Sequence, residues 1–181
     1  MKLTTSRLVL DALRPSDAET LFSYRADPEV ARFQGWRPAT LHEAQEFIGA
    51  QVAVEPNTPD SWFQRAIRLR DGDALIGDLG LYFPADPDGS VEFGISLARP
   101  YQGQGYASEA LRAVLAWSFG ELGRQRVHAS VDPRNHPSMS LLRALGMRQE
   151  AYYAKAFQLH GEWVDDVIFA ILAREWHSTD A

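Results

Sequence analysis

The sequence predicts an α/β domain with a mixed sheet of the α+β kind, and three patterns support this prediction. Residues 91–97 alternate apolar with polar side chains, and apolar residues at helical spacing follow over 107–119, so a helix follows a strand. Strand-like runs also flank short turn signals over 62–83 and again over 148–172. Helices that alternate with strands and hairpins are typical of a sheet covered by helices.

The first third of the chain predicts one strand and two helices. Residues 3–13 alternate in the manner of a strand, and a helix over 15–27 follows, opened by proline and ended before the next proline. A short helical turn is expected over 29–33. Thr40 and Glu43 then form a capping box, which indicates the start of a further helix.

Three antiparallel strands and a crossover are expected next. Asp71–Gly72 joins the second and third strands, and a turn cluster at Pro84–Gly89 leads into the strand at Val91. The remaining elements are a strand over 126–131, a helix from Pro137 to Gly146, and a hairpin of 148–159 and 163–172. The predicted order is β-α-α-β-β-β-α-β-α-β-β. A strand–helix–strand crossover normally joins parallel neighbours, so the strands at 91 and 126 should be parallel.

Length and composition limit the possible classes of protein. The chain has 181 residues, 45% of them hydrophobic, so residues 1–181 are expected to form a single domain without help from disulfides. The absence of cysteine excludes thiol chemistry and zinc–thiolate sites. A formal net charge of −6 argues against nucleic acid as a partner, and no apolar run is long enough to span a membrane. We therefore expect a cytoplasmic protein.

The loop between the central strand and its helix is suited to binding an anion. In Gln102-Gly103-Gln104-Gly105-Tyr106-Ala107, two glycines allow backbone N–H groups to converge on a phosphate at the positive end of the helix dipole. The alternative is a tight turn with no ligand. The GxxxxGK[ST] pattern is absent, and a dinucleotide fingerprint would need a third glycine where Ser108 stands.

Gln-x-x-Gly-x-Ala after a strand resembles the acetyl-coenzyme A pyrophosphate loop of the GNAT acetyltransferase superfamily. A second family segment follows at the expected distance, Asn135-His136-Pro137-Ser138 with Leu141, Leu142, Leu145 and Gly146. The likeness is greatest to the branch that acetylates the N-terminal α-amine of ribosomal proteins, and to relatives acting on other small amines. It extends over nearly the whole chain, from Thr5–Leu8 to Arg174–Trp176.

The resemblance implies a fold and a set of cofactor contacts. In the GNAT fold, the strands matching 91–97 and 126–131 splay apart, and the pantetheine arm of acetyl-CoA lies between them. Backbone groups of Ile95 and Leu97 would pair with that arm, while Asn135 and Ser138 would lie near its amide and its sulfur. The loop Gln102, Gly103, Gln104, Gly105, Tyr106 and Ala107 would bind the pyrophosphate, the last four through backbone N–H groups. Asn135 and Ser138 also suit helix capping, which is the alternative for both.

Catalysis is expected to proceed without a covalent intermediate. A neutral amine can attack a thioester directly, which suits a chain without cysteine and without a Gly-x-Ser-x-Gly elbow. Glu92 is the candidate base, because it shares a strand face with Gly94 and matches an acidic position of several family members; the alternative is a solvated edge carboxylate. Many members carry a tyrosine acid where this chain has Leu142. The resemblance to the N-terminal-acetylating branch implies Ser138 as the substitute proton donor, with Tyr106 or a water as alternatives.

The acceptor side is less defined by sequence. Phe33 and Trp36 fall in a stretch that covers the acceptor site in the resembled family, and the alternative is that they cover core. Glu162, Asp165 and Asp166 could hold a cation, but three carboxylates at a turn are typical of a solvated edge, so no role is assigned to them. Scattered histidines do not predict a metal site.

These inferences predict an N-acetyltransferase that moves the acetyl group of acetyl-CoA to a primary amine within a ternary complex. The acceptor is expected to be a protein N-terminal α-amine or a small-molecule amine, and the chain a monomer or homodimer that uses no metal. Two alternatives stay open. One is a catalytically silent acyl-CoA sensor, suggested by Leu142, and the other is a dinucleotide-binding oxidoreductase, suggested by Gly-x-Gly after a strand.

Overall fold

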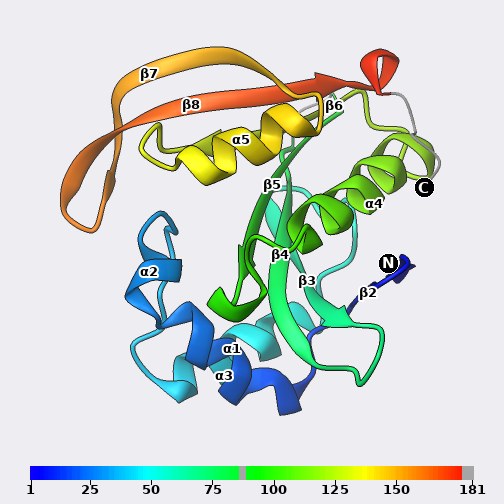
Figure 1. Ribbon diagram of the computed structural model, residues 1–181, viewed down its shortest axis with the longest axis vertical. Coiled ribbons are helices and arrows are strands. Elements are labelled where there is room, and N and C mark those ends of the chain that lie inside the picture. Colours follow the sequence, from blue (N-terminus) through cyan, green and yellow to red (C-terminus); the bar gives the residue numbers. More distant parts are fainter. Residues whose placement is uncertain (86–88, 177–181) are drawn as a thin grey trace.

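The computed structural model describes residues 1–85 and 89–176, and its strands form one eight-stranded sheet in the order β1-β2-β3-β4-β5-β6-β8-β7 (Figure 1). The strands are β1 (Leu3–Thr4), β2 (Leu8–Asp11), β3 (Ser61–Leu69), β4 (Leu75–Phe83), β5 (Ser90–Leu97), β6 (Arg126–Val131), β7 (Arg148–Leu159) and β8 (Glu162–Leu172). The helices are α1 (Ala18–Arg25), α2 (Pro28–Ala31), α3 (Leu41–Gln51), α4 (Tyr106–Gly120) and α5 (His136–Ala144). The predicted mixed α/β class is confirmed.

The beginning of the chain differs from the sequence prediction. Residues 3–13 were expected to form one strand, but β1 and β2 are two short strands that pair antiparallel across a tight turn. Thr5 closes this turn: its backbone N–H donates to the Leu8 carbonyl, and its Oγ1 accepts from the Leu8 N–H, both at 2.9 Å. Alternation of side chains cannot reveal such a reversal, because the apolar period continues through it.

Several local signals produced the expected structures. Gly72 has a φ of 86° in the turn between β3 and β4, where a left-handed conformation favours glycine. Thr40 caps α3 by accepting from the Glu43 N–H at 3.2 Å. The Glu43 carboxylate, however, accepts from the Ala39 N–H rather than from the cap residue itself. The predicted turn cluster at Pro84–Gly89 includes residues 86–88, which lie outside the described residues.

The central feature of the sheet is the junction between β5 and β6. These strands are parallel, as predicted, but they pair only at Ser90–Arg126, Val91–Val127 and Glu92–His128. Beyond these positions, β5 continues to pair with β4, and β6 continues to pair with β8. The two strands therefore splay apart after Glu92, which confirms the predicted opening of the sheet.

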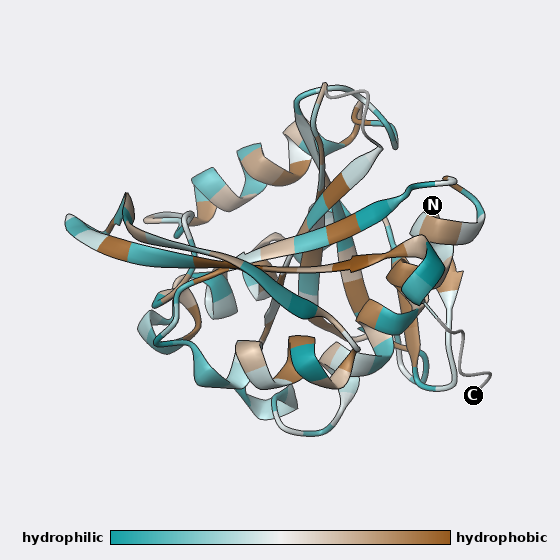
Figure 2. Ribbon diagram, turned by 90° about the horizontal axis from the view of Figure 1, so that it is seen from above, coloured by the Kyte–Doolittle hydropathy of each residue, from teal (hydrophilic) through white to brown (hydrophobic). Residues whose placement is uncertain are grey.

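Helices cover the two faces of the sheet differently. Leu111 and Val114 of α4 pack with Phe63 and Leu81 on one face, and Leu21 of α1 belongs to a second apolar cluster on the other face. Figure 1 shows α1 and α3 on one side of the β3–β4 pair and α4 on the other. Hydrophobic residues are prominent along the central strands in Figure 2. Burial of these apolar faces is the main stabilising contribution, at about 25 cal/mol for each Å² removed from water.

A buried ionic network joins α1 to the sheet beside the opening. The Asp78 carboxylate on β4 is fully buried and accepts from the Tyr24 hydroxyl at 2.6 Å and from Arg25 Nη2 at 2.5 Å. The Gln64 side-chain amide donates to the same carboxylate. Burial raises the pKa of the Tyr24 phenol well above its usual value, and the Asp78 charge raises it further. Arg25 is thereby fixed with its charge compensated.

We predict that Asp78→Asn destabilises the fold by about 3–5 kcal/mol, because it leaves the Arg25 charge buried without its partner. Chemical unfolding in urea at neutral pH measures this change. Asp73→Asn is a matched control, since Asp73 pairs with Arg14 at the surface, where solvent screens the ion pair, and its loss should be much smaller than that of Asp78→Asn. Equal losses in the two variants would contradict the assignment of Asp78 to a buried network.

Candidate active site

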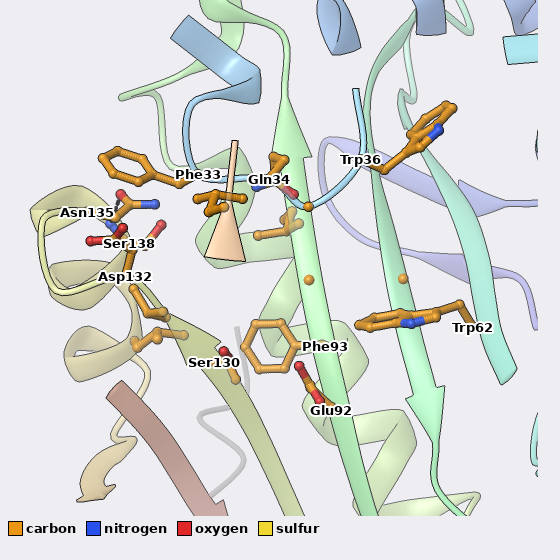
Figure 3. Close-up of a pocket in the computed structure, with 18 of the residues that line it drawn as sticks. Phe33, Gln34, Trp36, Trp62, Glu92, Phe93, Ser130, Asp132, Asn135 and Ser138 are labelled. Atoms are coloured by element: carbon orange, nitrogen blue, oxygen red, sulfur yellow. Dashed lines mark hydrogen bonds between the residues drawn. The ribbon is translucent and has the colours of Figure 1, made fainter. Parts of the chain in front are cut away.

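A cavity of about 440 Å³ opens where β5 and β6 separate. Figure 3 shows Phe93 of β5 and Ser130 of β6 facing each other across this opening. Loop 33–36 and the first turns of α5 complete its walls. The cavity brings together six residues that the sequence singled out: Phe33, Trp36, Glu92, Ile95, Asn135 and Ser138.

One side of the cavity is aromatic. Trp36 stacks on Phe47 of α3 with ring centroids 4.3 Å apart, and the Arg25 guanidinium lies 5.7 Å from the Trp36 ring. Trp62 of β3 lines the same side and is 42% exposed. Phe33 and Trp36 therefore line the cavity, and Trp36 also packs against the second apolar cluster. Aromatic faces next to a carboxylate attract cationic amines.

Glycines form part of the cavity wall. Gly80 on β4 and Gly94 on β5 are paired neighbours, and both line the cavity. A Cβ on Gly80 would lie 2.5 Å from the Gln64 amide, whereas a Cβ on Gly94 would meet open space. The missing side chain at 94 leaves room beside Glu92, which lies two residues earlier on the same strand face.

Glu92 lies at the last paired position before the strands separate. Its carboxylate lines the cavity, and its side chain is 28% exposed. His128 is its pairing partner on β6, with Nε2 3.7 Å from Oε2 of Glu92. His128 Nδ1 is buried without a hydrogen-bond partner among the described residues, which favours the tautomer with its proton on Nε2, facing the carboxylate. The sequence predicted that Glu92 faces this side of the strand but not that a histidine lies opposite it.

Asn135 and Ser138 act in α5 as well as lining the cavity. Asn135 is the N-cap of α5, and its side-chain oxygen accepts from the Ser138 N–H at 3.2 Å (Figure 3). Asn135 therefore both caps α5 and lines the cavity, whereas Ser138 lines the cavity and supplies the capped N–H without acting as a cap itself. Leu142, where a tyrosine acid is common in the resembled family, is buried and lines the cavity. The Ser138 side chain supplies the hydroxyl of this wall.

The predicted anion loop lies at the start of α4, outside the lining of the cavity. Gly103 and Gly105 have φ values of 70° and 81°, and Gly105 is the N-cap of α4. Gln102 Nε2 donates to the Leu97 carbonyl at 2.9 Å, and Gln104 Nε2 donates to the Pro100 carbonyl at 2.5 Å. Both glutamine side chains thus stabilise the loop itself, which leaves backbone N–H groups as the groups available to a ligand.

These features fit the parts of acetyl-CoA. Beyond Glu92 the β5 edge has no partner on β6, so its backbone groups are available to an amide-bearing arm. The first N–H groups of α4 lack intrahelical acceptors and converge at the left-handed Gly105, which suits a diphosphate. Ile95 and Leu97 both lie on this stretch of β5, although only Ile95 lines the cavity.

The three carboxylates of the last hairpin do not form one cluster. Asp166 is buried and accepts from the Ser130 hydroxyl at 2.7 Å, whereas Asp165 accepts from the Tyr152 hydroxyl. Glu162 is exposed and lies 3.7 Å from Arg134. The three carboxylates therefore have separate environments.

A further carboxylate that the sequence did not single out lines the cavity. Asp132 accepts from the Arg134 guanidinium at 2.6 Å and 2.9 Å. The side-chain bond from Arg134 lowers the pKa of the Asp132 carboxyl, in spite of its burial. Asp132–Pro133 marked only the end of a strand in the sequence, and no spacing rule connects it to Glu92. Gly80 and Gln64, which also line the cavity, likewise lack local sequence signals.

The described residues contain neither a metal-binding cluster nor a membrane-spanning helix. In the part of the chain that the structure describes, no group of three or more histidine, aspartate or glutamate side chains is placed to hold a metal ion. Among the helices within residues 1–85 and 89–176, none combines the length and apolarity needed to cross a membrane.

Comparison with known proteins identifies the class. The family described as acetyltransferase (GNAT) domain matches residues 7–148. An uncharacterised N-acetyltransferase of Bacillus subtilis is 31% identical over 177 residues, covering 98% of this chain and 100% of that protein. The ribosomal protein uS5-alanine N-acetyltransferase of Escherichia coli is 27% identical over 183 residues, covering 97% of this chain and 93% of the relative.

A solved structure of a GNAT-family acetyltransferase from Bacillus anthracis has a TM-score of 0.86 at 26% identity, covering 97% of this chain and 100% of that one. The chain belongs to the GNAT acetyltransferase family, whose members use acetyl-CoA. It is an acyltransferase that acetylates an amine. The relatives favour neither a silent acyl-CoA sensor nor an oxidoreductase.

We predict that the Glu109 carboxylate at the start of α4 stabilises the fold in a pH-dependent way. Burial raises its pKa, but hydrogen bonds from Thr5, Arg7 and Ser6 outweigh that effect and leave the pKa below its ordinary value. The stabilisation is therefore complete above the unfolded pKa of about 4.3 and is lost as pH falls through the folded pKa. Glu109→Gln should cost about 1–2 kcal/mol at pH 7, since charge-assisted hydrogen bonds are lost.

Urea unfolding of wild type and Glu109→Gln between pH 7 and pH 3 measures this dependence. The difference between the two proteins should shrink as pH falls below about 4.3. The exposed Glu46→Gln is the control and should stay within about 0.5 kcal/mol of wild type. A Glu109→Gln defect of constant size across this pH range would contradict the prediction.

We predict that Gly94→Val obstructs the acceptor side of the cavity. Gly94 lies in a strand without a positive φ, and its missing Cβ points into open space, so valine fits the backbone. The kcat/KM for the amine should fall at least about 10-fold, because a shift of about 1 Å in the reacting atoms can cost about 100-fold. Steady-state kinetics should show a larger rise in KM for the amine than for acetyl-CoA. Gly49→Val, on the exposed side of α3, is the control; an unchanged amine KM in Gly94→Val would contradict the prediction.

Proposed function

We propose that this chain acetylates a primary amine by direct transfer from acetyl-CoA, with the acceptor entering the cavity beside Glu92. The observation that carries the proposal is the position of Glu92 at the point where β5 and β6 separate, next to the open space at Gly94. A carboxylate there can reach an amine that enters from the aromatic side, while the splayed edge of β5 receives the acyl donor.

In this proposal acetyl-CoA supplies the thioester, and the chain orients both partners. The N–H groups of Gln104, Gly105, Tyr106 and Ala107 bind the diphosphate, and Gln102 and Gly103 shape the loop. Backbone groups of Ile95 and Leu97 pair with the pantetheine arm, with Asn135 near its amide side. The positive φ values of Gly103 and Gly105 and the N-cap position of Gly105 support this assignment.

Glu92 is proposed as the base that removes a proton from the acceptor ammonium. An α-amine with a pKa of about 7.7–8.0 costs only about 1 kcal/mol to deprotonate at pH 7, whereas a lysine side chain at about 10.4 costs about 4–5 kcal/mol. A partly exposed carboxylate therefore suits an α-amine better than a lysine. His128 Nε2, at 3.7 Å, stays within electrostatic reach of the Glu92 carboxylate.

Ser138 is proposed to assist the leaving thiolate. It lines the cavity from the first turn of α5, and its backbone N–H is occupied by Asn135, so its hydroxyl is the group available to the sulfur. Leu142, on the next turn of α5, supplies no proton. Ser138 is accordingly a hydrogen-bond donor to the departing sulfur, with a proton delivered through its hydroxyl.

The acceptor is proposed to contact Phe33 and Trp36. Both residues line the cavity. Trp36 stacks on Phe47 and lies on the same side as Trp62, whereas Phe33 lies on the side of Asn135 (Figure 3). The relative that acetylates an alanine of a ribosomal protein supports a peptide N-terminus as acceptor, and a small-molecule amine fits the same cavity. The aromatic surface and the Glu92 charge favour a cationic amine over a neutral acceptor.

Release of free thiol from acetyl-CoA in the presence of amine panels tests the proposal, using peptides with free N-termini, polyamines and lysine derivatives. Wild type should turn over at least one α-amine, and Glu92→Gln should lower kcat/KM by about 10²–10⁴-fold at pH 7. The defect should shrink above pH 9, where an α-amine is already neutral. Glu162→Gln, which changes an exposed carboxylate that does not line the cavity, should retain activity. Thermal stabilisation by acetyl-CoA without turnover of any amine would contradict the proposal.

A further inference from the structure

The N-terminal turn is tied to the first turn of α4. The Glu109 carboxylate accepts from Thr5 Oγ1 at 2.5 Å, from Ser6 Oγ at 3.0 Å and from the Arg7 backbone N–H at 2.8 Å. Arg7 Nε completes the set at 2.6 Å. Four donors from three consecutive residues converge on one carboxylate, about a hundred positions away in the chain. Four charge-assisted hydrogen bonds to one carboxylate hold it more firmly than a single surface ion pair would.

Arg7 also reaches the anion loop. Its Nη1 donates to the Gln104 carbonyl at 3.0 Å, and its guanidinium carbon lies 4.4 Å from the centre of the Tyr106 ring. Its Nη2 is the nearest atom to the position that a Cβ on Gly105 would occupy, at 3.4 Å. The side chain therefore touches Gln104, Gly105 and Tyr106, three of the four residues whose N–H groups are proposed to bind the diphosphate.

The bond to the Gln104 carbonyl fixes the direction of a neighbouring donor. The Gln104 C=O and the Gly105 N–H belong to one planar trans peptide, in which the two groups point in opposite directions. Since Arg7 holds the carbonyl on its own side, the Gly105 N–H must point away from Arg7. Glycine at 105 would otherwise ease rotation of this peptide, because the peptide turns about ψ of Gln104 and φ of Gly105, and Gly105 has a positive φ and no Cβ to restrict it.

Because the Arg7 charge is neutralised by Glu109, Arg7 influences an anion in the loop by holding the backbone in place and not by charge attraction. Its guanidinium is paired with Glu109, whose hydrogen bonds keep the pKa of that carboxyl below its ordinary value. The pair is close to neutral as a unit, so it adds little net attraction for an anion. Without Arg7, in contrast, the Glu109 carboxylate would be a negative charge at the end of α4 where a diphosphate is expected.

We infer that Arg7 is a positioning residue for the diphosphate of acetyl-CoA: it orients the Gln104–Gly105 peptide so that the Gly105 N–H faces the ligand. This inference rests on the proposed cofactor site. It assigns a role to a turn that precedes the sheet strand β2 and that no local motif connects with α4. Arg7 itself does not need to touch the coenzyme.

Three acyl donors separate this role from others: acetyl-CoA, acetyl-3′-dephospho-CoA and S-acetylpantetheine, which has no diphosphate. Arg7→Met should lower kcat/KM by about 10-fold for the first two, equivalent to the loss of one charge-assisted hydrogen bond, and leave S-acetylpantetheine unchanged. The change should lie in KM for the acyl donor and not in kcat. Arg14→Met is the matched control, because Arg14 is similarly exposed, at 43% against 45%, and is paired with Asp11 and Asp73.

Each other outcome overturns the inference. A defect confined to acetyl-CoA would mean that Arg7 contacts the 3′-phosphate directly, and an equal defect with S-acetylpantetheine would mean general damage to the site. Unchanged kinetics of Arg7→Met with all three acyl donors would show that Arg7 has no role in binding the acyl donor. Arg7→Lys, which keeps the charge but cannot hold both Glu109 and Gln104 in one plane, should remain defective even where its melting temperature matches wild type. If wild type shows no response to any coenzyme A derivative, the proposed function fails and the inference that rests on it falls too, whereas normal kinetics of the Arg7 variants would overturn the inference alone.

Discussion

The structure depends on the early end of pairing between β5 and β6. Three paired positions hold these parallel strands together, and the last of them joins Glu92 to His128. Each strand then follows its other neighbour, β4 or β8, so the sheet opens without breaking. An unpaired strand edge inside a protein is costly unless something satisfies its backbone groups. The opening is therefore the place that we propose for the extended, amide-bearing arm of the acyl donor, and it also holds the candidate base Glu92.

Buried polar interactions keep this opening in shape from the acceptor side. Asp78 lies on β4 two residues before Gly80, and it fixes Arg25 and Gln64, which both line the cavity. A buried ion pair gives little net stability compared with apolar packing, but it strongly penalises other arrangements. The network thus places α1 and the aromatic surface around Trp36 at a set distance from β5. The absence of a side chain at Gly94 matters only because its surroundings are fixed in this way.

On the donor side, the same kind of constraint acts through the N-terminal turn. Glu109 lies in the first turn of α4, where the helix dipole stabilises a carboxylate. An uncompensated carboxylate there would repel a diphosphate bound at the same helix end. The donors of Thr5, Ser6 and Arg7 neutralise it and hold the loop at Gln104. Two parts of the chain that are distant in sequence therefore meet at the proposed diphosphate site. In the proposed mechanism only Glu92 and Ser138 transfer protons, and the other site residues orient the two substrates.

The sequence alone determined the elements whose signals are local: the Asp71–Gly72 hairpin, the Thr40 cap, the Gly105 loop before α4 and the Asn135 cap of α5. Each depends on backbone preferences or hydrogen bonds within a few residues, so the information lies in a short segment. The tertiary structure decided the reversal between β1 and β2, the pairing of Glu92 with His128, the Asp78 network and the link from Arg7 to Gln104. These depend on strand register and on contacts between residues tens of positions apart. Periodicity gives the face on which a side chain lies, but only the folded sheet determines what stands opposite it.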